Sequence, residues 1–259
     1  MHRKFHQLTT LCKIVPLFGL LIGGAAGAAT VTLAPTDDTY VYNFAPTTNY
    51  GSAASFATGN VQSGNSIHRW YSFLKFDLSG IPSGQTIVGA TLHLYQVNGA
   101  GFTTGGTDVV HVADDSWSEG SVTWNNQPAM GSVLGSSPDT KDHRGWSQWD
   151  LFSTGMWNAA ADQTDNVLSL ALKESAAGTH NWCSKESDLT NCLAPGESGP
   201  APSLRRPYLE VSYVPVPAAV WLFGSGLFAM VGFASTRKVS KRVGLCAIPT
   251  NQVCHTERR

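Results

Sequence analysis

Short runs of alternating apolar and polar residues, separated by turn residues, set the fold class of this chain. The run "RWYSFLKFDLSGIPSG" (69–84) carries on one face Trp70, Leu74, Phe76 and Leu78. In "TIVGATLHLYQV" (86–97) the inward positions are Ala90, Leu92 and Leu94, because successive side chains of a strand point to opposite faces. Further strands are expected in "TVTLAPTDDTYVYNF" (30–44), "DVVHVADD" (108–115), "DNVLSLALKE" (165–174) and "RRPYLEVSYV" (205–214). Many short strands with Gly, Pro and Asn turns predict an all-β protein, an antiparallel β-sandwich.

Composition narrows the choice of partners. The net charge of −1 gives no electrostatic basis for binding nucleic acid. Charged residues make up 14% of the chain, against about 25% in typical domains. The sequence contains no phosphate-binding glycine loop, no dinucleotide motif and no zinc-type Cys/His spacing. We therefore expect no nucleic acid partner and no cofactor beyond a structural calcium ion, discussed below.

The N-terminal residues 1–29 have the features of a secretory signal peptide. His2, Arg3 and Lys4 form a basic start, "IVPLFGLLIGG" is a short apolar region, and "AAGAAT" supplies small residues for cleavage. Such a segment is removed on export, here after Ala28 or Ala29. The remaining roughly 180 residues, 30–213, suffice for one domain with its own core.

A second apolar segment lies near the C-terminus, within 214–242. Its uncharged core, Ala218 to Ala234, approaches the lower limit of roughly 17–25 residues for a bilayer-spanning helix. The basic residues that follow are those of a cytoplasmic flank: Arg237, Lys238, Lys241 and Arg242. A buried core helix is the alternative, but such a helix has a polar stripe. We predict a single transmembrane helix, followed by a tail, 243–259, of unassigned role.

This C-terminal segment resembles a known sorting signal. The stretch "VPVPAAVWLFGSGL" followed by basic residues is similar to the VPLPA-type PEP-CTERM signal of Gram-negative bacteria. Two features depart from that pattern: Val216 replaces the commoner Glu, and the chain continues past the basic cluster. The resemblance implies processing by an exosortase, transient anchoring in the inner membrane, and delivery to the cell surface or extracellular matrix.

A second resemblance covers most of the region between these segments. The blocks "DDTYV", "PTTNYGSAASFATGN", "SFLKFDLSGIPSGQTIVGATLHLY", "DDSWSEGSVTWNNQP" and "RRPYLEVSY" occur in this order. They resemble the DNRLRE domain, also classed as carbohydrate-binding module family 96. The resemblance implies a β-sandwich of jelly-roll type that binds polysaccharide, with acidic polymers such as alginate among the ligands.

Two cysteines, Cys183 and Cys192, lie in the region expected to be exported. An oxidising compartment permits their pairing, and the loop between them, "SKESDLTN", is short and polar. We predict a disulfide that stabilises the fold by roughly 2–3 kcal/mol in the chain-entropy model. Two unpaired thiols are the alternative.

The outward face of the 69–78 strand is the predicted ligand site. It carries cations interleaved with rings, to which the next strand adds two side chains; the set is Arg69, Tyr71, Phe73, Lys75, His93 and Tyr95. Rings offer flat platforms for sugars, while Arg and Lys hydrogen-bond carboxylates, so the set suits a uronate-containing chain. Alternatively, Tyr71 and Phe73 pack under a loop or against a second sheet.

Acidic residues suggest two other kinds of site. Asp114, Asp115 and Glu119 invite comparison with a glycosidase pair, but that needs a separation of about 5–9 Å, which sequence spacing does not establish. The family resemblance gives their block a structural role, with Trp117 and Trp124 beside a turn, and we predict no catalytic residue. Oxygen donors at strand ends are calcium candidates: Asp37, Asp38, Asn49, Asp114 and Asp115. Solvated turn residues are the alternative.

These observations predict an exported, non-catalytic protein that binds polysaccharide, an acidic one by preference, at the cell surface or in an extracellular matrix. Two other function classes remain open. One is a structural or adhesion protein of the matrix that does not recognise sugar. The other, less favoured, is a polysaccharide lyase or glycosidase.

Overall fold

The structure, a computed structural model, describes residues 27–100, 106–137, 145–193, 197 and 204–214. Nearly all of the predicted signal peptide and of the predicted sorting segment, and the whole 243–259 tail, lie outside the described residues. In the described part no helix is long and apolar enough to cross a membrane. The described residues belong to one compact unit, Ala25–Val216.

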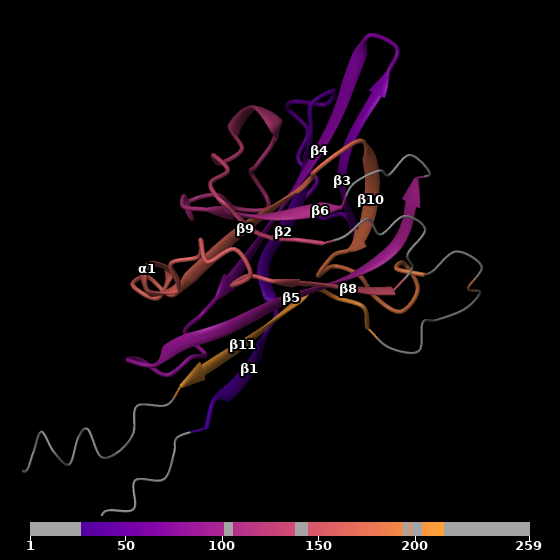
Figure 1. Ribbon diagram of the computed structural model, residues 1–259. Coiled ribbons are helices and arrows are strands. Elements are labelled where there is room, and N and C mark those ends of the chain that lie inside the picture. Colours follow the sequence, from indigo (N-terminus) through magenta and orange to yellow (C-terminus); the bar gives the residue numbers. More distant parts are fainter. Residues whose placement is uncertain (1–26, 101–105, 138–144, 194–196, 198–203, 215–259) are drawn as a thin grey trace, which may run out of the picture. The chain divides into compact units, whose positions relative to one another are not determined.

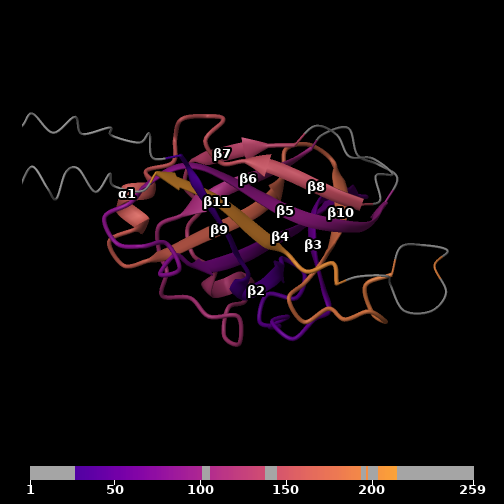
Figure 2. The same cartoon turned by 90° about the horizontal axis from the view of Figure 1, so that it is seen from below.

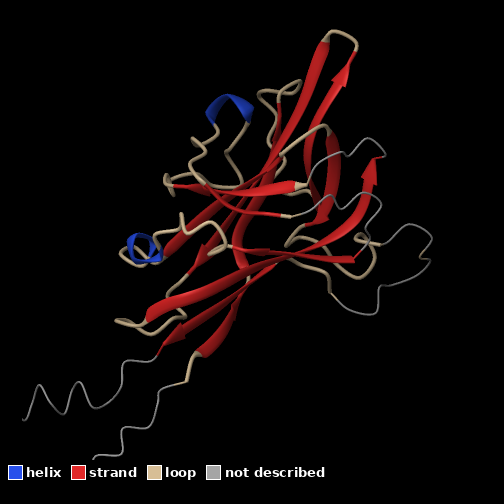
Figure 3. Cartoon of the chain, viewed as in Figure 1, coloured by secondary structure: helices blue, strands red, loops and turns tan. Residues whose placement is uncertain are grey.

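The fold is built from strands, as predicted (Figures 1 and 3). They are β1 (Ala29–Leu33), β2 (Pro35–Tyr42), β3 (Ser55–Ser63), β4 (Ser66–Asp77), β5 (Thr86–Ala100), β6 (Thr107–Val112), β7 (Val133–Ser136), β8 (Gly145–Asp150), β9 (Val167–Glu174), β10 (Gly178–Cys183) and β11 (Tyr208–Val214). In the described ranges the helices are one 3-10 turn, η1 (Trp124–Asn126), and one short α-helix, α1 (Ala159–Asp162).

All strand pairs of the described residues are antiparallel, which confirms the prediction of an all-β, antiparallel protein. The strands form one hydrogen-bonded, eleven-stranded sheet in the order β1-β11-β5-β10-β3-β4-β9-β6-β7, with β8 beside β5 and β2 beside β4. This sheet curls over its own core, as the view from below shows (Figure 2). The finer prediction, a jelly-roll sandwich, stays a prediction.

The main core lies inside the curl. The inward positions predicted for 86–97 are confirmed, because Ala90, Leu92 and Leu94 are all buried there. They belong to the same cluster as the inward residues of β4 and β9. Strands that are not neighbours in the sheet therefore contribute side chains to one core. The largest members of this cluster include Trp149, Trp182, Phe56 and Phe76. Burial of this apolar area is the main stabilising term, about 25 cal/mol per Å².

A second, smaller core lies on the opposite face of β4, β9 and β6. It contains Val41, Phe73, Val110, Val112, Trp117, Val122 and Ala171. Three of these, Phe73, Val110 and Ala171, directly adjoin main-core residues in the sequence. Residues 113–130, which contain η1, supply Trp117 and Val122 and cover this face. These central strands are therefore buried on both sides where they pass under this segment, so apolar residues occupy both of their faces there.

The first and last strands pair with each other. Ala29 lies opposite Tyr213, and Leu33 lies opposite Leu209. The first and last described strands therefore lie side by side, below the other strands in Figure 1. The β3–β4 hairpin extends at the top of the same view.

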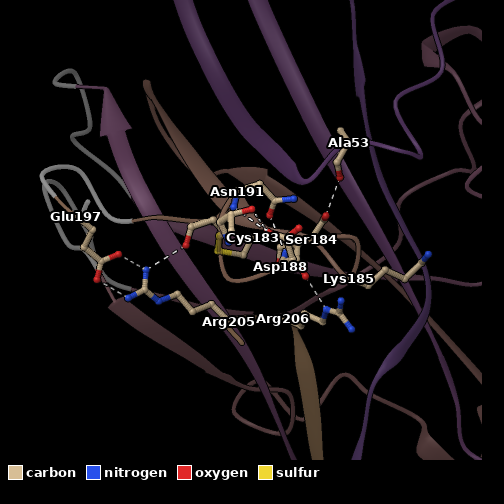
Figure 4. The surroundings of a disulfide bond; sticks show 12 residues. Ala53, Cys183, Ser184, Lys185, Asp188, Asn191, Glu197, Arg205 and Arg206 are labelled. Carbon is tan, nitrogen blue, oxygen red and sulfur yellow. Dashed lines mark hydrogen bonds and ion pairs between the residues drawn. A yellow bond between two sulfur atoms is a disulfide. The ribbon is translucent and has the colours of Figure 1, made fainter. Parts of the chain in front are cut away.

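The predicted disulfide is confirmed. Cys183, the last residue of β10, is bonded to Cys192, with their Cα atoms 5.7 Å apart. Figure 4 shows the surroundings of the bond, where Ser184 donates to the carbonyl of Ala53 and Arg206 donates to that of Ser187. The loop that the disulfide closes is thus held to two other segments.

Candidate functional site

The predicted ligand face on β4 is largely covered. Phe73 is fully buried in the second core, so the prediction that it offers a platform to solvent is wrong. Tyr71 stacks on Trp124, with ring centroids 5.1 Å apart. Lys75 lies 4.6 Å above the Trp117 ring and donates to the Trp117 carbonyl. The physical reason is that residues 113–130 pack over this face, which was the alternative considered from the sequence.

Arg69 lies at the half-buried end of the same strand. Its backbone N–H donates to the Asn43 side chain at 2.8 Å. Its guanidinium forms no hydrogen bond or ion pair among the residues that the structure describes. Arg69 is therefore the one cation of the predicted β4 set that keeps its charge available for a ligand.

His93 and Tyr95 lie elsewhere in the molecule. They belong to β5, which β10 and β3 separate from β4 in the strand order. The six predicted residues therefore do not form one surface. The expectation failed because consecutive strands in the sequence need not be neighbours in the sheet.

His93 and Tyr95 instead join two aromatic residues that the sequence reasoning did not select. Tyr208 of β11 lies directly opposite His93, and the two rings stack with centroids 4.3 Å apart at 7°. Trp146 of β8 lies directly opposite Tyr95. The Trp146 ring contacts Tyr95 edge-on at 5.5 Å and Tyr208 edge-on at 5.2 Å. We name His93, Tyr95, Trp146 and Tyr208 the β8–β5–β11 aromatic face.

This face presents one ring to solvent on a fixed support. Trp146 is 38% exposed, whereas His93 is 8% exposed. Both neighbours of Trp146 are held by strand pairing, so the indole can accept an apolar sugar face without much loss of side-chain freedom. Gln148, two residues on, is exposed and lies opposite His93. Its amide can donate to and accept from hydroxyl groups.

One edge of the aromatic face is fixed by an arginine. The Arg205 guanidinium lies 4.3 Å above the Tyr95 ring and forms a bidentate pair with Glu197, at 2.6 and 2.7 Å. It also donates to the carbonyl of Cys192 at 3.1 Å (Figure 4). The disulfide loop and the aromatic face are therefore connected through one buried side chain.

The other edge carries negative charge. Asp150 of β8 and Glu210 of β11 are exposed and lie opposite Thr91 on the two sides of β5. Burial lowers the pKa of His93, and the nearby Glu210 carboxylate partly opposes that shift. His93 is thus uncharged at neutral pH and acts as a stacked ring.

A second group of rings lies on β2, β4 and the turn after β2. Tyr42 stacks on Trp70 with centroids 4.5 Å apart at 2°, and Phe44 stacks on His68 at 4.1 Å. Phe44 is 51% exposed. This group provides an independent aromatic surface against which the β8–β5–β11 aromatic face can be compared.

Most of the calcium candidates have other roles. The Asn49 amide donates to the carbonyls of Glu119 and Val122, and so holds the 113–130 segment in place. Asp114 is exposed and accepts from Ser116. Asp115 lies near the carboxylates of Asp162 and Asp165, and burial raises the pKa of its own carboxyl.

Asp37 and Asp38 contact Glu119, which the sequence reasoning did not count as a metal ligand. Asp37 accepts from the Glu119 N–H at 3.2 Å, and the Asp38 N–H donates to the Glu119 carboxylate at 3.1 Å. Asp38 is 1% exposed, and burial raises its pKa to about 8, although an N–H donated by Lys185 opposes the shift.

The sequence contains a signal that could have identified Trp146. In "GWSQWD" (145–150) the even and odd positions separate cleanly, with Trp149 buried and Trp146 exposed. Such alternation is typical of a half-buried strand. Tyr208 lies in a run that was predicted as a strand, but its partners in the sheet could not be deduced from one sequence.

Comparison with known proteins gives the family. The family model described as carbohydrate-binding module family 96 matches residues 29–193. The chain is also similar to a gellan lyase from Bacillus sp., with 32% identity over 117 residues, which is 44% of this chain. The chain spans only 4% of the length of that lyase. Because the family match covers more than half of the chain, the protein belongs to carbohydrate-binding module family 96.

Proposed function

We propose that the protein binds polysaccharide through the β8–β5–β11 aromatic face and does not cleave it. The observation that carries the proposal is the exposed Trp146 ring, supported edge-on by Tyr95 and Tyr208 from two neighbouring strands. Pyranose rings have apolar faces of C–H groups that stack on indole, and polar groups at the rim fix their orientation. Gln148 and Glu210 are the rim groups for hydroxyls here.

We further propose that the protein prefers acidic polymers. Arg69 lies on β4, apart from the aromatic face. It supports the preference as a separate contact for a long chain, since its guanidinium is unpaired among the described residues and can bind a carboxylate in bidentate fashion. Asp150 and Glu210 repel acidic groups at their edge of the aromatic face. An acidic chain would therefore need to keep its carboxylates away from that edge, and retention would weaken as salt screens the charges.

The absence of catalysis is likewise proposed. The relative whose name is that of a lyase is matched over only 4% of its length, so its activity does not transfer with the match. The exposed carboxylates Asp150 and Glu210 flank Thr91 on one rim of the face, beside stacked rings instead of across a cleft. A binding surface accounts for this arrangement without a reaction.

Export completes the proposed function. We assign residues 1–29 to a signal peptide and 214–242 to a PEP-CTERM sorting segment processed by an exosortase. The protein would then pass through the inner membrane and act at the cell surface or in the extracellular matrix. The disulfide supports this location, since such bonds persist in oxidising compartments.

Affinity electrophoresis in gels that contain one polymer each tests the proposal. Alginate serves as the acidic polymer and hydroxyethyl cellulose as the neutral one. Trp146→Ala should lose at least about tenfold in affinity, because a stacking platform is removed. Phe44→Ala is the matched control, since it removes an exposed ring from the other aromatic group. Arg69→Ala reports on the acidic preference and should weaken retention by alginate alone.

Three results would overturn the proposal. Unchanged retention of Trp146→Ala, with loss in Phe44→Ala, would move the site to the second group of rings. If neither the wild-type protein nor any variant is retained by any polymer, the structural or adhesion class is favoured. Release of unsaturated or reducing ends from a polymer incubated with the protein would establish an enzyme instead.

A further inference from the structure

Three carboxylates from separate segments meet beside the disulfide loop. Asp38 comes from β2, Glu119 from the segment after β6, and Glu186 from the loop that follows β10. One carboxylate oxygen from each lies within 4.8 Å of the others. Like charges at this spacing repel, so the arrangement needs a compensating group.

Two of the carboxylate oxygens are buried without a partner. Asp38 Oδ2 accepts the Lys185 N–H at 2.6 Å, but Asp38 Oδ1 has no hydrogen bond. Asp38 is only 1% exposed, so this oxygen is shielded from water. Glu186 Oε2 is likewise buried without a donor. A buried carboxylate oxygen that accepts nothing costs free energy, because it has left water and gained no replacement. Asp38 Oδ1 therefore points to a missing ligand of positive charge.

Among the described residues, the cation that contacts this cluster reaches two of the three carboxylates and does not satisfy the two unpartnered oxygens. The Lys185 ammonium lies 2.9 Å from the Glu119 carboxylate and pairs with Glu186 through Oε1. With all three carboxylates ionised, as a bound metal ion would require, they and one ammonium leave a formal charge of about −2, which one divalent cation would balance.

The surrounding backbone holds the donors in place. Asn49 donates to the Glu119 carbonyl, and Asp37 accepts from the Glu119 N–H. Gly51 lies so close that a Cβ there would approach the Glu119 carbonyl oxygen to 2.2 Å. The Glu119 segment is thus fixed against β2 before any ion arrives, which lowers the entropic cost of binding.

We propose that Asp38, Glu119 and Glu186 bind a divalent cation, and that the ion is Ca²⁺. The donors are all oxygen, and their number and negative charge suit Ca²⁺, which takes several carboxylates in flexible geometry. Mg²⁺ keeps more of its waters and uses fewer carboxylates, and Zn²⁺ prefers His and Cys. The ion links β2, the 113–130 segment and the disulfide loop, and its role is to stabilise them together.

Calorimetry and thermal unfolding of the full-length protein test this site. After treatment with a chelator, titration with CaCl₂ should give one binding event per chain. At about a hundredfold excess over Kd, the melting temperature should rise by about 5–10 °C. Glu186→Gln should reduce Ca²⁺ affinity at least about tenfold, and Asp38→Asn should do so more strongly. Asp114→Asn, a predicted candidate outside the cluster, is the matched control and should behave as wild type.

The proposal fails if wild-type protein gives no heat with millimolar Ca²⁺ and melts at the same temperature in Ca²⁺ and in chelator. It also fails if Glu186→Gln binds Ca²⁺ as wild type does, since the ion would then lie elsewhere. An equal response to MgCl₂ would overturn the choice of ion. If Asp38→Asn does not fold, Glu186→Gln decides the outcome, because Glu186 is less buried.

Discussion

Neighbouring residues of β4 face different surroundings, and this decides what each can do. Leu74 belongs to the main core and Phe73 to the second core, although they are adjacent in sequence. Arg69 shares a face with Phe73 but lies near the end of the strand, where its guanidinium is free of partners among the described residues. The same alternation therefore yields a buried ring at one position and an available cation four residues away.

Substitutions at these two positions should differ sharply in their effect on stability. Phe73→Ala should lower the free energy of unfolding by about 3–5 kcal/mol, because it leaves a cavity in the second core. Arg69→Ala should change it by no more than about 0.5 kcal/mol. Urea denaturation of both variants measures the difference. A loss below about 1 kcal/mol in Phe73→Ala would mean that the 113–130 segment does not seal this face.

The stacked His93 ring predicts a dependence of stability on pH. Its pKa is lowered in the folded state by burial, so protonation favours the unfolded chain. This contribution to stability is complete above the unfolded pKa of about 6.5 and is lost as pH falls towards and through the folded pKa. His111 acts in the opposite sense, since its hydrogen bond to Asp162 raises its pKa.

Comparison with His93→Gln isolates this contribution. Chemical denaturation at about pH 7.5 and about pH 5 should show wild type losing stability relative to the variant as the pH falls, because only wild type must protonate a buried ring. Both proteins keep His111, so its opposite effect cancels. A difference between the two proteins that is the same at both pH values would contradict the burial of an uncharged His93.

At the scale of elements, the strands divide into two classes. Strands β5, β8 and β11 bury one face and present the other, so their sequences alternate and their outward residues build the aromatic face. Strands β4 and β9 are buried on both faces. The aromatic face forms on the first class, whereas the second class holds the two cores together, with Arg69 near one end of β4 still able to meet a ligand.

The disulfide loop should contribute to stability as an element. Replacing Cys183 and Cys192 by Ser should lower the free energy of unfolding by about 2–3 kcal/mol in the chain-entropy model. The change also loosens the Cys192 carbonyl to which Arg205 donates. Thermal melts with and without reductant measure the effect. Reductant should lower the melting temperature of wild type but leave the double variant unchanged; equal melting of the two proteins without reductant would contradict the prediction.

At the scale of the molecule, every strand pair of the described sheet is formed by residues from Ala29 to Val214. The last strand, β11, ends at Val214 and pairs with both β1 and β5. Residues 215–259 lie outside the described residues. Truncation after Val214 should therefore leave the melting temperature within a few degrees of wild type, where about 2–4 °C corresponds to 1 kcal/mol at this size. A larger fall would place the removed segment in the stabilising contacts.

The sequence predicted the fold class and the inward residues of single strands because side-chain alternation is a local property. It predicted Ala90, Leu92 and Leu94 in the core, and Cys183 paired with Cys192. It did not predict that His93 meets Tyr208 instead of Arg69, because strand order depends on long-range pairing. Glu119 and Glu186 were missed as possible ligands for the same reason, since their meeting with Asp38 joins segments far apart in the chain.

Because β1 pairs with β11, the fold does not require the strands to follow one another in their present order along the chain. Ala29 lies opposite Tyr213, and paired residues of antiparallel strands have Cα atoms only about 4.5–5.5 Å apart. A short linker could join these ends, and the β3–β4 turn could be opened at Gly64, which is exposed and has a φ of 59°. Such a circular permutant would keep every strand pair and lose only the covalent turn between β3 and β4. Its new termini would lie at the far tip of this hairpin.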